Sequence, residues 1–185
     1  MPELHLQHPD FLLPSGGRIR PIDAGSDSEI ALVATRMRDT LIEVEGEAQG
    51  IALHTLDWLE ARVRWHLDRN QTLARVYLAE TEHGEITGHC IVREELDAQG
   101  CAAGLIAALF VVPSWRKQSV ANQLLLAGEA WCRSVALQRA ATWTTAANLK
   151  LIRLFARHGY GVVDRQPHPT TGTAMIQLAK SLDPS

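Results

Sequence analysis

The sequence predicts an α/β protein whose elements follow the order β-α-α-β-β-β-α-β-α-β-β. Residues 74–81 and 86–94 alternate apolar and polar residues around a short EHGE turn, which is typical of an antiparallel hairpin. Residues 102–112 are apolar at nearly every position, as in a strand buried on both faces at the centre of a sheet. Elsewhere, apolar residues recur every three or four positions, which indicates amphipathic helices.

The N-terminal part of the chain predicts an extension followed by one folded domain. Residues 1–17 contain three prolines and end in a Gly-Gly pair, so no period is established there. We therefore expect an N-terminal extension over 1–17 and a single domain over 18–185, which is within the size range of one domain. Residues 18–24 alternate and predict the first strand.

Two helices are expected before the hairpin. Ser26 and Asp27 are good N-cap residues for a helix over 29–44, and Gly46 and Gly50 are expected to break the helical pattern. Thr55 then opens a second helix, whose apolar residues share one face.

The second half of the chain predicts two further helices and three strands. Apolar positions from Val120 onward mark a helix, and residues 139–146 return to a strand. Asn148 is expected to cap a helix that Gly159 ends. The last two strands are expected at 160–166 and 171–182.

Composition excludes several classes of protein. Hydrophobic residues make up 46%, charged residues 21%, and the net charge is −3, as in a soluble globular protein without the basic footprint of a nucleic-acid binder. The longest apolar run, residues 101–112, is shorter than the roughly 20 residues of a membrane-spanning helix. The N-terminus lacks the pattern of a secretory signal. We therefore expect a cytoplasmic protein with no membrane or nucleic-acid partner.

Metal, redox and hydrolase motifs are absent from the sequence. The three cysteines have no CxxC spacing, and the eight histidines are scattered without an HExxH pattern, so we expect neither disulfides nor a metal site. There is no phosphate-binding GxxxxGK[ST] motif, no GxGxxG after a strand, and no GxSxG.

Two motifs between Leu105 and Gly161 give the sequence a family resemblance. Residues 111–121 fit the pattern V-x-P-x-x-R-x-x-G-x-G/A at Val111, Pro113, Arg116 and Ala121. Farther on, an Asn precedes an apolar helix that ends in a Gly-aromatic pair, at the four positions Asn148, Leu154, Gly159 and Tyr160. Both motifs resemble the GNAT superfamily of acyl-coenzyme-A-dependent N-acyltransferases.

This resemblance implies a mixed, mainly antiparallel central sheet flanked by helices on both faces. It also implies an N-acetyltransferase that takes acetyl-CoA as co-substrate, needs no metal, and transfers the acetyl group by direct attack to an amine of a small molecule or a protein. The strand end, the following loop and the next helix would bind the cofactor. The expected cofactor-binding residues are Phe110, Val111, Val112, Arg116, Lys117, Gln118, Ser119, Val120, Ala121, Asn122, Asn148 and Phe155.

Two physical observations, independent of the resemblance, support a cofactor-binding role for the loop after residue 112. The first amides of a helix have no internal partner and carry a partial positive charge, so a strand-to-helix loop suits a pyrophosphate. Basic residues also outnumber acidic ones between Arg116 and Tyr160, where Glu129 is the only acid. A polyanion such as coenzyme A would be attracted there.

The acids between Asp39 and Glu60 suggest which charge the acetyl acceptor carries. This segment has six acids and no Lys or Arg. In the family it contributes to the acceptor pocket, so an acidic lip would suit a cationic small-molecule amine. The alternative is a solvated helix face. The oligomeric state is left open, with a homodimer as one possibility.

Three departures from the family pattern concern chemistry. Ser119 replaces a glycine, Phe155 replaces the tyrosine expected to protonate the leaving thiolate, and residues 104–112 contain no carboxylate to act as a base. His89 is the first candidate for a substitute base and Glu94 the second; a buried structural histidine is the alternative for His89. A non-catalytic acyl-CoA-binding or sensing domain is therefore the competing function.

Overall fold

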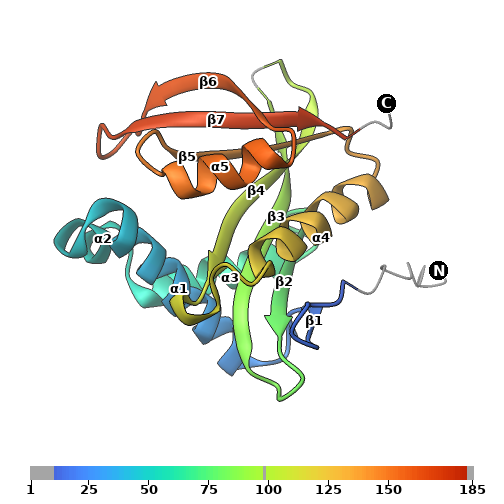
Figure 1. Cartoon of the computed structure of the whole chain (residues 1–185). Helices are drawn as coiled ribbons and strands as arrows, with labels where there is room; N and C mark the ends of the chain where they lie inside the picture. Colours follow the sequence, from blue (N-terminus) through green and yellow to red (C-terminus); the bar gives the residue numbers. More distant parts are fainter. Residues whose placement is uncertain (1–10, 98, 183–185) are drawn as a thin grey trace.

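Seven strands form one mixed sheet in the computed structural model, which describes residues 11–97 and 99–182 (Figure 1). The strand order is β1-β2-β3-β4-β5-β7-β6, and β4 with β5 is the parallel pair among antiparallel neighbours. The strands are β1 (Arg18–Pro21), β2 (Ala74–Glu80), β3 (Ile86–Leu96), β4 (Ala102–Val111), β5 (Arg139–Thr145), β6 (Gly161–Pro167) and β7 (Ala174–Ser181). The apolar strand predicted to be central is β4, which lies in the middle of the sheet.

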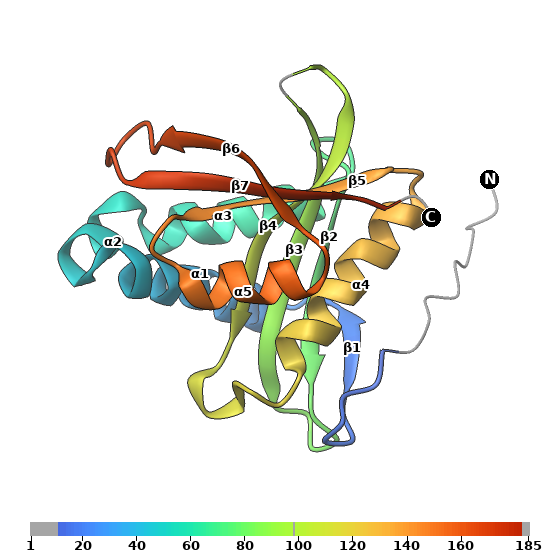
Figure 2. The same cartoon turned by 45° about the horizontal axis from the view of Figure 1, so that its top comes forward.

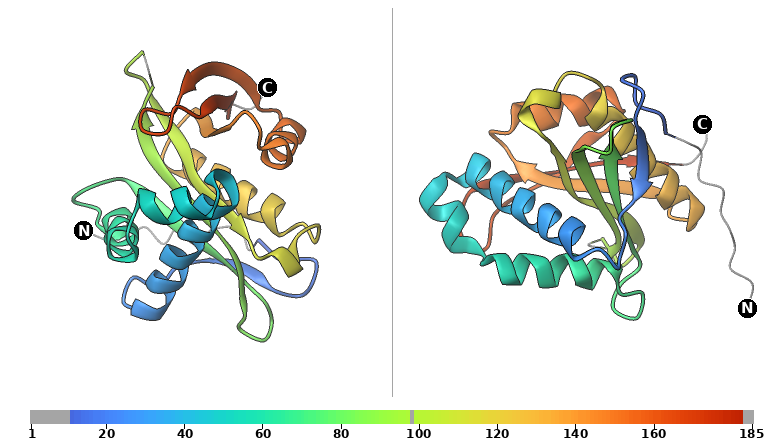
Figure 3. Two further views of the ribbon diagram at one scale, coloured as in Figure 1. Left: turned by 90° about the vertical axis from the view of Figure 1, so that its left-hand side faces the viewer. Right: turned by 90° about the horizontal axis from the view of Figure 1, so that it is seen from below.

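Helices cover both faces of the sheet. They are α1 (Asp27–Glu45), α2 (Glu47–Leu53), α3 (Leu56–Leu67), α4 (Val120–Ser134) and α5 (Leu149–Arg157), with a 3₁₀ turn, η1 (Pro113–Trp115), before α4. Helices α1 and α3 pack on one face and α4 on the other, and the right panel of Figure 3 shows the sheet between them. The predicted fold class, mixed and mainly antiparallel with helices on both faces, is confirmed. No helix in the described part of the chain combines the length and apolarity needed to cross a bilayer.

The period-two pattern of the hairpin divides the core into two clusters. Val76 and Leu78 of β2 face α1 and α3, whereas Tyr77 and Ala79 face α4. The same alternation continues on β3. Because successive side chains of a strand point to opposite faces, each strand contributes to both clusters at once.

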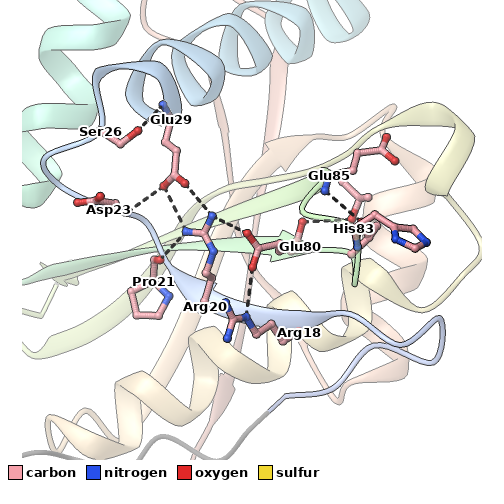
Figure 4. Close-up of polar contacts among 12 residues, drawn as sticks. Arg18, Arg20, Pro21, Asp23, Ser26, Glu29, Glu80, His83 and Glu85 are labelled. Atoms are coloured by element: carbon pink, nitrogen blue, oxygen red, sulfur yellow. Dashed lines mark hydrogen bonds and ion pairs between the residues drawn. The ribbon is translucent and has the colours of Figure 1, made fainter.

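A charged network fixes the edge strand β1 (Figure 4). The Arg20 guanidinium binds Glu29 of α1 at 2.7 Å and Glu80 of β2 at 2.9 Å. Glu29 also accepts from the Asp23 backbone amide at 2.9 Å. These bonds lower the pKa of both carboxyl groups, chiefly through the hydrogen bond from Arg20. The network therefore joins β1, β2 and the start of α1.

One element differs from the sequence-based expectation. Gly46, at φ 86°, ends α1 as expected, but Gly50 lies inside the additional short helix α2 rather than in a break. A Cβ at Gly50 would lie 2.5 Å from the backbone nitrogen of Ile42. Gly50 is therefore needed for the close approach of two helix backbones, a long-range constraint that sequence pattern cannot reveal.

Much of the expected N-terminal extension lies outside the described residues. Within residues 11–17, the Ile19 amide donates to the Phe11 carbonyl, and Leu13 is 3% exposed within the core on the α4 side. This segment therefore packs against the sheet.

Candidate active site

The sheet opens between its two parallel strands. Backbone pairing of β4 with β5 is confined to Gly104 with Ala140 and Leu105 with Ala141. Farther along, the Thr142 hydroxyl donates to the Ile106 carbonyl at 2.9 Å, and the described strands share no backbone pairing beyond that point. In Figure 1, β4 runs down the centre while β5 crosses above it. The strands thus leave a wedge-shaped opening at their carboxyl ends.

A β-bulge lies at the start of this opening. Ile91 of β3 pairs with Ala108, but the next residue, Val92, pairs with Ile106. Ala107 is therefore an extra residue in β4, and it is exposed although it lies in a central strand. Bulges re-aim the backbone and are frequent beside active sites.

The loop between β4 and α4 has an unusual backbone conformation with free amides. Lys117 and Ser119 have φ values of 65° and 63°, which is costly for residues other than glycine. The first backbone hydrogen bond into α4 comes from Gln123 to the Ser119 carbonyl. Among the described residues, the amides from Lys117 to Asn122 have no acceptor. Free amides at a helix N-terminus can bind anions.

Arg116 holds this loop against α1. Its guanidinium binds both carboxylate oxygens of Glu43, at 3.0 and 2.8 Å, and its Nε donates to the Val111 carbonyl. The bond from Arg116 lowers the pKa of Glu43. Sequence analysis assigned Arg116 to the cofactor and Glu43 to an acidic lip; in the structure they form a pair that fixes the loop.

Other expected cofactor residues have structural partners. Asn148 caps α5 by accepting from the Leu151 amide at 3.3 Å. The Asn122 side chain bonds His158 at 3.2 Å. Phe155 is fully buried, edge-to-face with the Tyr160 ring at 4.8 Å. The bond between Asn122 and His158 therefore joins α4 to the end of α5, whereas Asn148 acts within α5.

A buried charge network, which sequence analysis missed, also supports this region. Glu129 of α4 is 1% exposed and binds Lys180 of β7 at 2.7 Å and the Tyr160 hydroxyl at 3.1 Å. Lys180 also donates to the His158 carbonyl at 2.9 Å. The pKa of Tyr160 is raised by burial and by Glu129, so this phenol is held protonated.

A cavity of about 350 Å³ lies on the opposite face and reaches the opening. Its walls come from α1, α3, β3, β4 and β5. The lining residues are Met37, Thr40, Leu41, His54, Trp58, Leu59, Arg62, His66, Ile91, Arg93, Leu105, Ile106, Ala107, Ala108 and Trp143. None of the six acids expected to form an acidic lip lines it. Its ionisable side chains are two arginines and two histidines.

The two candidate bases lie on different faces of the sheet. His89 is fully buried, its ring stacks on Phe110 at 5.7 Å, and neither ring nitrogen has a hydrogen-bond partner in the described part of the chain. Burial lowers the pKa of His89 to about 3. Glu94 follows Arg93 on β3, so its side chain points away from the cavity that Arg93 lines. Neither residue lines the cavity.

His54 lines the cavity and was not singled out by sequence analysis. It follows α2, and its ring stacks on Trp58 with centroids 3.8 Å apart. Burial lowers the pKa of His54 below its usual range. His54 is therefore neutral near pH 7, with a lone pair available.

The described residues contain no group of three or more metal-ligating side chains close enough to hold a metal ion.

The buried cysteines are poor nucleophiles. Burial raises the pKa of Cys132 to about 12 and that of Cys90 higher still. Both thiols therefore stay protonated at neutral pH.

Comparison with known proteins identifies the class. The profile of the acetyltransferase (GNAT) family matches residues 37–160, more than half of the chain. The chain therefore belongs to the GNAT family of acetyltransferases. No curated protein matches the sequence.

Solved structures share the fold. A chain of the NatC complex, bound to Gag peptide and CoA, superposes with a TM-score of 0.71 at 15% identity, over 89% of this chain and 98% of that chain. The ribosomal-protein-alanine N-acetyltransferase of Brucella melitensis gives 0.70 at 18% identity, over 88% and 98%. The yncA protein of Salmonella typhimurium, solved with acetyl-CoA, gives 0.68 at 17% identity, over 92% and 96%. At these identities the likeness concerns the fold.

Proposed function

We propose that this protein transfers the acetyl group of acetyl-CoA to an amine acceptor by direct attack. The observation that carries the proposal is the row of free amides at the β4–α4 loop, beside the opening between β4 and β5. Family membership and fold neighbours solved with CoA or acetyl-CoA support it.

In this proposal the amides from Lys117 to Asn122 hold the pyrophosphate. The acyl-pantetheine arm then follows the end of β4, residues 107–112, where β5 has diverged. Arg116 contributes by fixing the loop to α1 rather than by touching phosphate. Phe155 and Asn148 contribute by holding α5 in place.

The reaction needs mainly orientation of its two substrates. The amine nitrogen attacks the thioester carbonyl, the C–S bond breaks, the thiolate leaves with a proton, and the amine loses one. Holding the reactants together can supply roughly 7 to 11 kcal/mol of the barrier, and acid–base help typically adds ~10²–10⁴-fold. An enzyme without the usual family acid and base can therefore remain active.

We propose His54 as the group that accepts the proton of the amine. Of the candidates, it lies at the cavity and is neutral near pH 7. His89, the first candidate from sequence, has no open path to solvent in its buried position. Glu94 points to the other face. Replacing His54 by Gln should lower kcat and flatten the acidic limb of its pH profile, whereas Glu94→Gln should change neither.

The competing function is a non-catalytic acyl-CoA sensor. It is favoured by Phe155 in place of the family tyrosine and by the absence of carboxylates from residues 104–112. Calorimetry with acetyl-CoA, combined with thiol release across a panel of amines, separates the two functions. Tight binding with thiol release supports transfer, whereas tight binding with persistent silence supports the sensor. Absence of binding would overturn both.

A further inference from the structure

The cavity beside the opening has one strongly basic end. Arg62 and His66 lie one turn apart on α3, and Arg93 reaches the same space from β3. None of the described residues that line the cavity is acidic. Glu95, just outside the lining, forms an ion pair with Arg93. Only Arg93 of the two arginines has a carboxylate partner among the described residues, which leaves an excess of positive charge.

Much of the hydrogen-bonding capacity of this end is unused. Arg62 stacks its guanidinium on the Trp65 ring at 4.0 Å and has no carboxylate partner among the described residues. The Nε of Arg93 is buried without a partner in the part of the chain that the structure describes. The Nδ1 of His66, a residue that is 4% exposed, is also buried without a partner. Unpartnered buried polar atoms are rare in folded proteins, and those gathered at one cavity indicate a missing ligand group.

The electrostatics of these groups agree with that interpretation. Burial and the charge of Arg93 lower the pKa of Arg62, while Glu95 opposes this effect. Burial, followed by the two arginines, lowers the pKa of His66 to about 3. His66 is therefore neutral and, in its Nδ1–H form, can donate a hydrogen bond. An anion placed here would relieve the repulsion between the arginines and accept from His66.

We propose that the acetyl acceptor is an amine that also carries a carboxylate, and that Arg62, Arg93 and His66 bind this carboxylate. The proposal rests on the transfer function proposed above and replaces the expectation of a purely cationic acceptor. A carboxylate suits the planar fork of a guanidinium, which can bind both of its oxygens. The same cavity reaches Ala107, Ala108 and Trp143 at the opening, where the amine would meet the thioester.

The test compares matched acceptors and matched variants. Amino acids and their carboxamides are assayed as acceptors, because each pair keeps the side chain and replaces the carboxylate by a neutral amide. We expect the parent protein to prefer the carboxylate form in kcat/KM. Arg62→Gln should reduce that preference about tenfold to a hundredfold, since hydrogen bonds to charged groups contribute about 1.5–3 kcal/mol. Arg62→Lys should recover part of it, and Arg69→Gln, which removes an exposed charge outside the lining, should leave it intact.

A binding measurement separates this proposal from the transfer function. Thermal stabilisation by each acceptor is measured in the presence of CoA, which requires no turnover. Carboxylate-dependent stabilisation that Arg62→Gln abolishes would support the site even in a protein that releases no thiol. Turnover of amines with no carboxylate preference, or a preference unchanged in Arg62→Gln, would overturn the site while the transfer function stands. Equal stabilisation by carboxylates and carboxamides would also overturn it.

Discussion

His89 shows how one buried residue makes stability depend on pH. Neither ring nitrogen has a hydrogen-bond partner among the described residues, so the folded protein resists protonation of His89. Its pKa is about 3 in the folded protein and near ~6.5 in an unfolded chain. The folded pKa is depressed, so the contribution of His89 is fully present above about pH 6.5 and is lost as the pH falls toward 3.

His89→Leu should therefore reduce acid sensitivity. Each proton taken up only by the unfolded state costs about 1.4 kcal/mol per pH unit. Between pH 7 and pH 5, we expect the parent to lose about 2 kcal/mol more than the variant in free energy of unfolding. Urea titrations at both pH values measure this. Turnover of the variant at pH 7 should stay close to the parent's, and a collapse of turnover with unchanged cofactor binding would restore His89 as the base.

At the loop, Ala121→Asp should abolish acetyl-CoA binding without unfolding the protein. The acid lies in the first turn of α4, where the helix dipole favours it by about 0.3–1 kcal/mol, so melting without ligand should hardly change. The new charge repels the pyrophosphate. The parent should gain ~2.7 kcal/mol from ligand at a hundredfold its Kd, and this gain should disappear in the variant.

Ala121→Asn is the control for bulk at the same position, because it has nearly the shape of Asp and no charge. It should bind acetyl-CoA more tightly than Ala121→Asp in calorimetry at matched salt. If Ala121→Asp binds as the parent does, the amides of this loop do not hold the pyrophosphate.

At the scale of elements, one ion pair joins β7 to both helices of the α4 face. Lys180 bonds Glu129 of α4 and the carbonyl that ends α5. Lys180→Met should lower the free energy of unfolding by about 3–5 kcal/mol, because Glu129 would keep a buried charge without its main partner. Lys150→Met, an exposed lysine on α5, should be close to neutral.

The double variant Glu129→Met with Lys180→Met checks the reason for that loss. Replacing a buried pair by apolar residues is often neutral, so the double variant should recover much of the stability lost in Lys180→Met. Denaturant unfolding of the four proteins gives the comparison. A double variant less stable than either single variant would show that packing, not the unpaired charge, causes the loss.

Local pattern predicted most elements because their signals are local. The hairpin of β2 and β3 follows from period-two alternation, and Asn148 caps α5 as its position indicated. Helix α2 was missed because Gly50 usually interrupts a helix, and only its closeness to Ile42 explains it. The loop amides were predicted because a strand, a break and a helix start follow one another in the chain.

The acceptor cavity could not be predicted, because its walls come from five separate elements. Arg62 and Arg93 are far apart in sequence, and both lie outside the acidic segment from Asp39 to Glu60. Two acids of that segment have other roles: Glu43 pairs with Arg116 and Glu45 accepts from Thr173. Charge counted along a chain does not reveal which side chains share a space.

At the scale of the whole molecule, ligand binding should be visible as a map of amide exchange. With acetyl-CoA bound, hydrogen exchange should slow at residues 117–122, whose amides gain acceptors, and at the end of β4. Amides of the edge strand β1 that exchange by local opening should remain unchanged, whereas core amides that exchange only through global unfolding should slow by the stabilisation that the ligand gives. Residue-resolved exchange by NMR measures both regions, and slowing at residues 117–122 no greater than in β1, the edge of the sheet opposite β6 (Figure 2), would contradict a site at this loop.

The short parallel pairing between β4 and β5 holds the two strands together at one end only. At that end, Gly104 has no room for a side chain, because an added Cβ would come within 2.1 Å of the Cys132 sulfur on α4. The paired ends of the two strands are therefore packed tightly against α4. Beyond Ile106, the described residues of β4 and β5 form no backbone pairs. A ligand that enters between the unpaired ends of β4 and β5 breaks no backbone pairing of the sheet. If the two strands move apart to admit the ligand, the movement is confined to their carboxyl ends. The hydrophobic core around their paired ends keeps its packing.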